Sequence, residues 1–125
     1  MALAREMMQG GLSAGTAQAL GGQSNTALAA AGNSQATATL IQTSNCIVTG
    51  ADGTKAVVLP ACNAGDEVWI INNSGSSLIV YPPSSAAIVV TGSGLGTVNA
   101  SYAQTTYTTC MYKCFSSTQW GVIKT

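Results

Sequence analysis

Histidine is absent from this 125-residue chain, and charge is scarce: four basic and four acidic residues give a net charge of zero. Without histidine, the chain has no imidazole general base and no histidine-ligated metal site. The basic residues are scattered along the chain, which argues against electrostatic binding of nucleic acid. They are Arg5, Lys55, Lys113 and Lys124. So little charge also gives little repulsion between copies, so we expect ordered self-association.

Long apolar runs are missing as well. No stretch approaches the roughly 20 apolar residues of a membrane-spanning helix, and the N-terminus lacks the continuous apolar core of a signal peptide. We therefore expect a soluble protein that is not secreted and does not contact a membrane.

Residues 1–36 are rich in Ala and Gly and contain no aromatic residue, Pro, Val or Ile. Such a segment cannot build a core of its own, so it is either a flexible linker or an arm that orders against a partner. We favour the arm because the segment carries six large apolar side chains. Leu3, Met7 and Met8 match one face of a short helix ended by Gly10 and Gly11. The side chains expected to contact the partner are Leu3, Met7, Met8, Leu12, Leu20 and Leu28.

Residues 37–125 use Val, Ile, Thr, Tyr and Trp, the residue types that suit a pleated sheet. Short apolar runs alternate with turn residues, which predicts about eight strands in a small antiparallel β-sandwich or barrel of jelly-roll type. Asp52-Gly53 predicts a hairpin turn, and Pro60 ends pairing because it has no N–H to donate. The expected strands are 38–48 (one strand or two), 55–59, 67–71, 77–81, 87–91, 97–104, 106–116 and 119–124.

Several of these strands are apolar on both faces. Trp69 and Ile71 share one face of their strand, whereas the residues between and before them share the other. This is more apolar surface than one core needs. We expect the outer face to be buried between subunits, the alternative being a two-layer sandwich with bulky rims. The residues expected in core or subunit contacts are Val68, Ile70, Ile79 and Tyr81.

The chain from Ala56 onwards carries a recognisable pattern of strands and turns. Its segments are 57–61 (Val-Val-Leu-Pro-Ala), 65–73 (Gly-Asp-Glu-Val-Trp-Ile-Ile-Asn-Asn), 77–82 (Ser-Leu-Ile-Val-Tyr-Pro) and 112–122, which contains Thr-Gln-Trp-Gly. The pattern resembles small β-rich head proteins of tailed bacteriophages, the decoration or cement proteins that sit outside an assembled capsid. Similar patterns also occur in modules of phage fibres and tails.

The resemblance implies a structural virion protein, not an enzyme, with no cofactor. Its partner would be the major capsid protein, and it would form a homo-oligomer, a trimer or alternatively a dimer. It would be made in the host cytoplasm and lie on the outer surface of the mature head, with residues 1–36 as the gripping arm. The alternative is a receptor- or glycan-binding β module of a fibre or tail. Its aromatic stacking platform would be Tyr102, Tyr107, Tyr112 and Trp120.

The four cysteines lack the two short paired spacings of a zinc site. Cys110 and Cys114 in one strand would stand roughly 13 Å apart on the same face, too far for a disulfide. We therefore favour buried free thiols at Cys46, Cys62, Cys110 and Cys114. Cross-strand disulfides and a metal site remain the alternatives.

No other motif predicts a catalytic, cofactor or metal residue. Asp66 and Glu67 are neighbours and so point to opposite faces of a strand, where they cannot share one substrate. Asp52 suits a turn. The glycine-rich segment 92–96 lacks the lysine and the helix of a phosphate-binding loop and is expected to be a turn.

Overall fold

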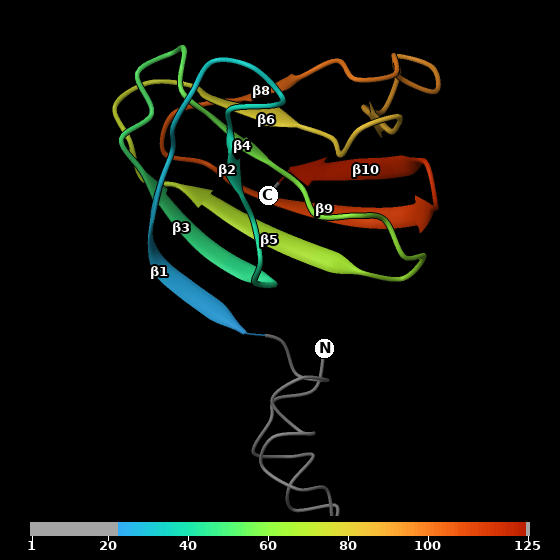
Figure 1. Cartoon of the computed structure of the whole chain (residues 1–125), viewed down its shortest axis with the longest axis horizontal. Helices are drawn as coiled ribbons and strands as arrows, with labels where there is room; N and C mark the ends of the chain where they lie inside the picture. The colour runs from blue at the N-terminus through green and yellow to red at the C-terminus, as the bar shows by residue number, and fades with distance from the viewer. Residues whose placement is uncertain (1–22, 125) are drawn as a thin grey trace, which may run out of the picture.

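A computed structural model describes residues 23–124, and in this range the chain is all-β (Figure 1). The helix expected near the N-terminus lies outside the described residues. None of residues 23–124 belongs to a helix that could span a membrane. The strands are β1 (Ser24–Ala29), β2 (Thr39–Leu40), β3 (Asn45–Thr49), β4 (Ala56–Val58), β5 (Glu67–Asn72), β6 (Leu78–Tyr81), β7 (Ala87–Val89), β8 (Tyr102–Gln104), β9 (Thr109–Ser116) and β10 (Gln119–Lys124).

The strands form two sheets, and neither closes into a barrel (Figure 1). One sheet has six strands in the order β1-β3-β5-β9-β10-β7, and the other has four in the order β2-β4-β6-β8. Alternate residues of β3, β5, β6 and β9 are buried, as the two-residue period of a pleated strand requires. A single core joins the two inner faces. Its larger members include Val48, Ile70, Tyr112 and Trp120 from the six-stranded sheet and Val57, Leu78 and Val80 from the four-stranded sheet.

Parallel pairs dominate, so the prediction of an antiparallel sandwich was wrong. Five of the eight strand pairs are parallel and three are antiparallel. The chain crosses from one sheet to the other after every strand from β1 to β8. Successive strands of the same sheet are therefore two crossings apart, and β1, β3 and β5 run in the same direction.

The turn at Asp52-Gly53 shows why the hairpin prediction failed. Asp52 does shape this turn: its Oδ1 accepts hydrogen bonds from the backbone N–H groups of Thr54 and Lys55 at 2.9 and 3.1 Å. The turn, however, carries the chain from β3 in one sheet to β4 in the other. A tight turn reverses the chain locally but does not decide which strand becomes the hydrogen-bonded neighbour. Only β9 and β10 are consecutive antiparallel partners among the described strands.

The composition placed residues up to 36 in an arm, yet strand β1 lies within that stretch. β1 pairs in parallel with β3 at the edge of the six-stranded sheet. Leu28 packs against the core, and Ala30, directly after β1, is part of it. Residues 24–30 are therefore part of the folded sheet.

Candidate functional site

The most distinctive surface of the described chain is the side of the six-stranded sheet that faces away from the four-stranded sheet, here called the outer face. Strand register lines up its side chains in rows across the sheet. Trp69 lies beside Met111, which lies beside Ile123, and Ile47 lies beside Ile71 in the next row. The apolar members of the outer face are Ile47, Trp69, Ile71, Val89, Met111, Phe115 and Ile123.

Three of these side chains are well exposed. Ile71 is 39% exposed, Ile123 45% and Phe115 60%. The Phe115 ring lies over Gly121 of the neighbouring strand, where an added Cβ would come within 2.5 Å of the ring. The absence of a side chain at Gly121 thus leaves room for an aromatic ring over β10. Together these residues make a broad apolar surface that is open to solvent in the single chain.

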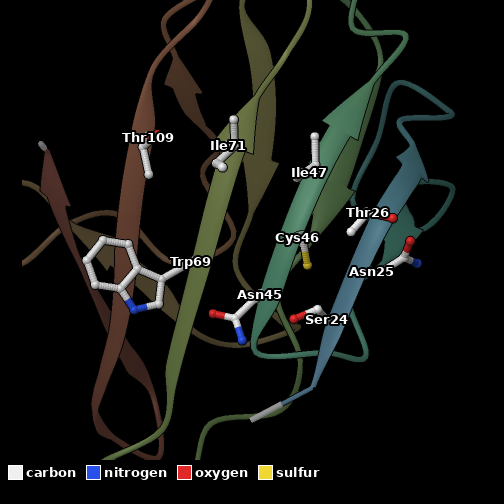
Figure 2. A pocket seen from close by; sticks show the side chains of 9 residues that line it. All are labelled: Ser24, Asn25, Thr26, Asn45, Cys46, Ile47, Trp69, Ile71 and Thr109. Atoms are coloured by element: carbon white, nitrogen blue, oxygen red, sulfur yellow. The ribbon is translucent and has the colours of Figure 1, made fainter. Parts of the chain in front are cut away.

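Two shallow grooves hollow the outer face. The larger, of about 330 Å³, crosses β1, β3, β5 and β9. In Figure 2, Ile47 and Ile71 lie side by side, and the Trp69 ring extends from β5 towards β9. The second groove, of about 290 Å³, lies over β9, β10 and β7 between Phe115 and Ile123. The second groove has mainly aliphatic and aromatic walls, which suits contact with apolar side chains. The larger groove combines Ile47, Trp69 and Ile71 with hydroxyl and amide side chains from β1, β3 and β9.

The strands of the six-stranded sheet carry very little charge. Glu67 and Lys113 stand opposite each other in the register and form an ion pair of 3.2 Å on the outer face. The other charged strand residue, Lys124, lies at the end of β10, with its Nζ 5.8 Å from the centroid of the Tyr102 ring. The strands of this face therefore contribute no net charge from Glu67 and Lys113, although covering the face would desolvate this pair.

The strand residues expected to contact a core or a subunit are not brought together. Val68 and Ile70 are 3% and 0% exposed, so they are core residues with no surface for another molecule. Ile79 and Tyr81 are half-buried on the four-stranded sheet. Leu28 packs against the core. The remaining predicted contact residues lie outside the described range; they are Leu3, Met7, Met8, Leu12 and Leu20.

Sequence reasoning missed the outward set because both faces of these strands are apolar. A signal for the outer face was nevertheless present. Glu67, Trp69 and Ile71 occupy every second position of one strand. Met111, Lys113 and Phe115 do the same in another strand. Because a strand points every second residue to the same side, each charged residue marks its strand's solvent side, and its apolar companions lie there with it.

The cysteines are free thiols. Cys110 and Cys114 both point inward from β9, as their spacing predicts, and Cys46 is also buried. Burial, together with a hydrogen bond to the Cys114 thiol, raises the pKa of Cys62 to about 12, so this thiol is protonated at neutral pH. Residues 23–124 contain no cluster of three or more His, Cys, Asp or Glu side chains that could hold a metal ion.

The aromatic residues proposed as a stacking platform do not form one. Tyr112 and Trp120 are fully buried, and Tyr102 meets Tyr112 edge-on with 6.4 Å between the ring centroids. Only Tyr107, at 71% exposure, is freely accessible among these four. These rings belong mainly to the core and cannot all stack on one sugar chain.

Comparisons with family models, with curated proteins and with solved structures find no match for this chain.

Proposed function

We propose that this chain is a structural virion protein, a capsid decoration or cement protein of a tailed phage. It binds the outer surface of the mature head and stabilises the head by bridging capsid subunits. It acts through protein surfaces and not through catalysis. The resemblance of the chain from Ala56 onwards to phage head proteins supports this proposal.

The observation that carries the proposal is the outer face of the six-stranded sheet. Ile71, Phe115 and Ile123 are exposed on it, and the charges of Glu67 and Lys113 neutralise each other. Monomeric soluble proteins rarely leave an apolar surface of this breadth open, and such surfaces usually mark contacts with other proteins. A protein that works by association is the simplest reading of this surface.

The stabilising mechanism is thermodynamic linkage. A protein that binds the expanded shell, and not its dissociated subunits, shifts the equilibrium towards the shell by mass action. A contact that spans two capsomers adds avidity, because the second half of the contact forms at high effective concentration. In this proposal the contacts with the major capsid protein come from Leu3, Met7, Met8, Leu12 and Leu20.

The test is co-sedimentation of the purified protein with expanded capsids stripped of accessory proteins. We expect saturation at a fixed number of copies per capsomer, together with increased heat resistance of the shell. The double variant Met7→Ser/Met8→Ser should weaken binding. Leu95→Ser, a change of similar size in an exposed loop, should bind like the wild type. Absence of binding to the shell would contradict the proposal.

The alternative, a receptor- or glycan-binding module, has one observation in its favour. Trp69 lines the larger groove next to Asn45 of β3, and Ser24 and Thr26 line the same groove from β1 (Figure 2). Aromatic rings flanked by amide and hydroxyl groups can stack against sugars and hydrogen-bond them. Under this alternative the protein would bind host glycans and not shells, and Trp69→Ala would abolish that binding.

A further inference from the structure

The outer face of the six-stranded sheet combines an exposed ring, two grooves and near-neutral charge on one surface. We infer that a second copy of this chain docks on this face, sheet against sheet, in a two-fold dimer. The inference rests on the proposed function in that the protein works by association. It assigns a second copy as the partner of this face, whereas residues 1–22 would contact the capsid.

The side chains of the outer face favour contact with another protein surface that is also largely apolar. The exposed groups of this face on β5, β9 and β10 include the large apolar side chains Ile71, Phe115 and Ile123, and its rows of side chains run across neighbouring strands without an unpaired charge. A nucleic acid or an anionic lipid would need free cations, but Lys113 is engaged by Glu67 at 3.2 Å. An identical outer face carries the same apolar side chains, and its two charged residues, Glu67 and Lys113, already pair with each other.

The size of the face is sufficient for a reversible dimer. Six strands at about 4.8 Å spacing make the sheet roughly 25 Å wide, and five residues per strand make it roughly 17 Å long. Stacking two such faces about 10 Å apart, as in a β-sandwich, would bury roughly 850 Å² in total by this flat estimate, and more with the relief of the side chains. This area lies in the range of weak, reversible protein contacts, so we expect a dimer that dissociates on dilution.

Symmetry favours two copies over three. In a two-fold dimer the same patch is used by both copies, so the patch must contain both protrusions and hollows. The outer face meets this condition, with the exposed Phe115 ring lying over β10 and the larger groove crossing β1, β3, β5 and β9. A trimer would need two different complementary surfaces on each chain. We therefore assign a dimer to this face.

The first experiment measures the mass of the full chain by sedimentation equilibrium over a range of concentrations. We expect twice the 12.5 kDa mass of one chain at high concentration. Phe115→Lys and Ile123→Lys place unpaired charge in the interface and should raise the dissociation constant about tenfold or more. Both residues are exposed, so both variants should fold. Leu95→Lys, at 75% exposure in a loop, is the matched control and should dimerise like the wild type.

The second experiment uses Trp69 as a reporter. Trp120 is fully buried in the core, whereas Trp69 lies on the outer face, so a change in acrylamide quenching on dilution reports on Trp69. We expect quenching of the wild type to increase as the protein is diluted through the dissociation constant. The Phe115→Lys variant should be strongly quenched at every concentration.

Several results would overturn the inference. A wild type that stays monomeric at all concentrations excludes the dimer, and if its Trp69 is also protected, the chain's own residues cover the face. A dimer unaffected by both face variants uses another surface. These measurements need no capsid, so a monomer that still saturates stripped shells would refute the dimer and leave the proposed function standing. A dimer that does not bind stripped shells would refute the proposed function and leave the dimer standing.

Discussion

Two glycines in the loop between β7 and β8 share a left-handed backbone but differ in their surroundings. Gly94 and Gly96 have φ angles of 73° and 79°. A Cβ on Gly96 would lie 2.5 Å from the carbonyl oxygen of Ile88, whereas a Cβ on Gly94 would have nothing within 4 Å. Gly96 therefore holds the loop close against β7, and Gly94 only allows it to turn.

We expect Gly96→Ala to lower the free energy of unfolding by about 3 kcal/mol, because it adds a clash with backbone to the left-handed strain. Gly94→Ala should cost about 1 kcal/mol, since only the strain applies. Urea unfolding followed by circular dichroism measures both. Equal losses for the two variants would contradict the close approach at Gly96.

Asp52 predicts a pH dependence at the same scale. Hydrogen bonds from the Thr54 hydroxyl and from the backbone N–H groups of Thr54 and Lys55 lower the pKa of Asp52 from 3.8 to about 2. A carboxyl group whose pKa falls on folding stabilises the fold when it is charged. Its contribution is therefore fully present above about pH 4 and is lost as the pH falls through 2.

We expect Asp52→Ala to lower the urea midpoint at pH 7 and the difference from the wild type to shrink towards pH 2. Asp52→Asn is the control, because it keeps an acceptor oxygen but does not titrate. Neither variant titrates at position 52, so the gap between Asp52→Asn and Asp52→Ala should not change with pH, whereas the gap between each variant and the wild type should contain the Asp52 titration step. Urea midpoints at several pH values provide the test, and a constant gap between Asp52→Ala and the wild type would rule out the shifted carboxyl group.

At the scale of elements, a buried polar network joins the two sheets. Gln104 of β8 donates through Nε2 to the carbonyl oxygens of Ile70 and Thr108 at 2.9 and 3.0 Å. Its Oε1 accepts the hydroxyl hydrogen of Tyr112 from β9 at 2.7 Å. Asn72 of β5 donates to the Gln104 carbonyl oxygen at 3.2 Å. The network therefore fixes β8 of one sheet against β5 and β9 of the other.

Tyr112→Phe should lower the free energy of unfolding by about 2 kcal/mol, because it leaves the buried Gln104 Oε1 without a donor. Burial raises the pKa of Tyr112 well above its usual value, so the hydroxyl donates throughout the neutral range. Tyr107→Phe, which removes an exposed hydroxyl, is the matched control and should change stability by less than about 0.5 kcal/mol. Equal effects in thermal unfolding would show that the buried bond contributes nothing.

At the scale of the whole molecule, the N-terminal boundary of the folded unit can be tested by deletion. The expected arm ended at residue 36, but β1 completes one edge of the six-stranded sheet and Ala30 belongs to the core. Deleting residues 1–22 retains every strand of both described sheets. Deleting residues 1–36 removes β1 and uncovers β3.

We expect the deletion of 1–22 to leave the thermal midpoint of a monomeric background such as Phe115→Lys unchanged. The deletion of 1–36 should lower that midpoint by roughly 10 °C or more, because apolar surface of the core becomes exposed. Differential scanning calorimetry measures both. If both deletions had the same midpoint, β1 would add no stability, and the compositional boundary would also be the structural one.

Much of the local structure could be predicted. Strands at 67–71, 77–81 and 119–124 were expected within a residue or two of their observed bounds, and Asp52 is the turn residue it was expected to be. The candidate site was predicted only in part. Two apolar faces were expected on the strand around Trp69, and Val68 and Ile70 were expected in core or subunit contacts without a choice between the two; both lie in the core.

The amino-acid sequence by itself determined that this chain is β-rich, where several of its strands lie, and that it cannot use histidine chemistry. Residue type, two-residue alternation and turn residues are local properties, and each acts within a few neighbours. Only the tertiary structure decided which sheet each strand joins, that most pairs are parallel, and that Trp69 and Phe115 face outward while Val68 and Tyr112 face the core. Backbone hydrogen bonds between strands are chemically alike for every sequence, so the choice among partners depends on how all the apolar faces are buried at once.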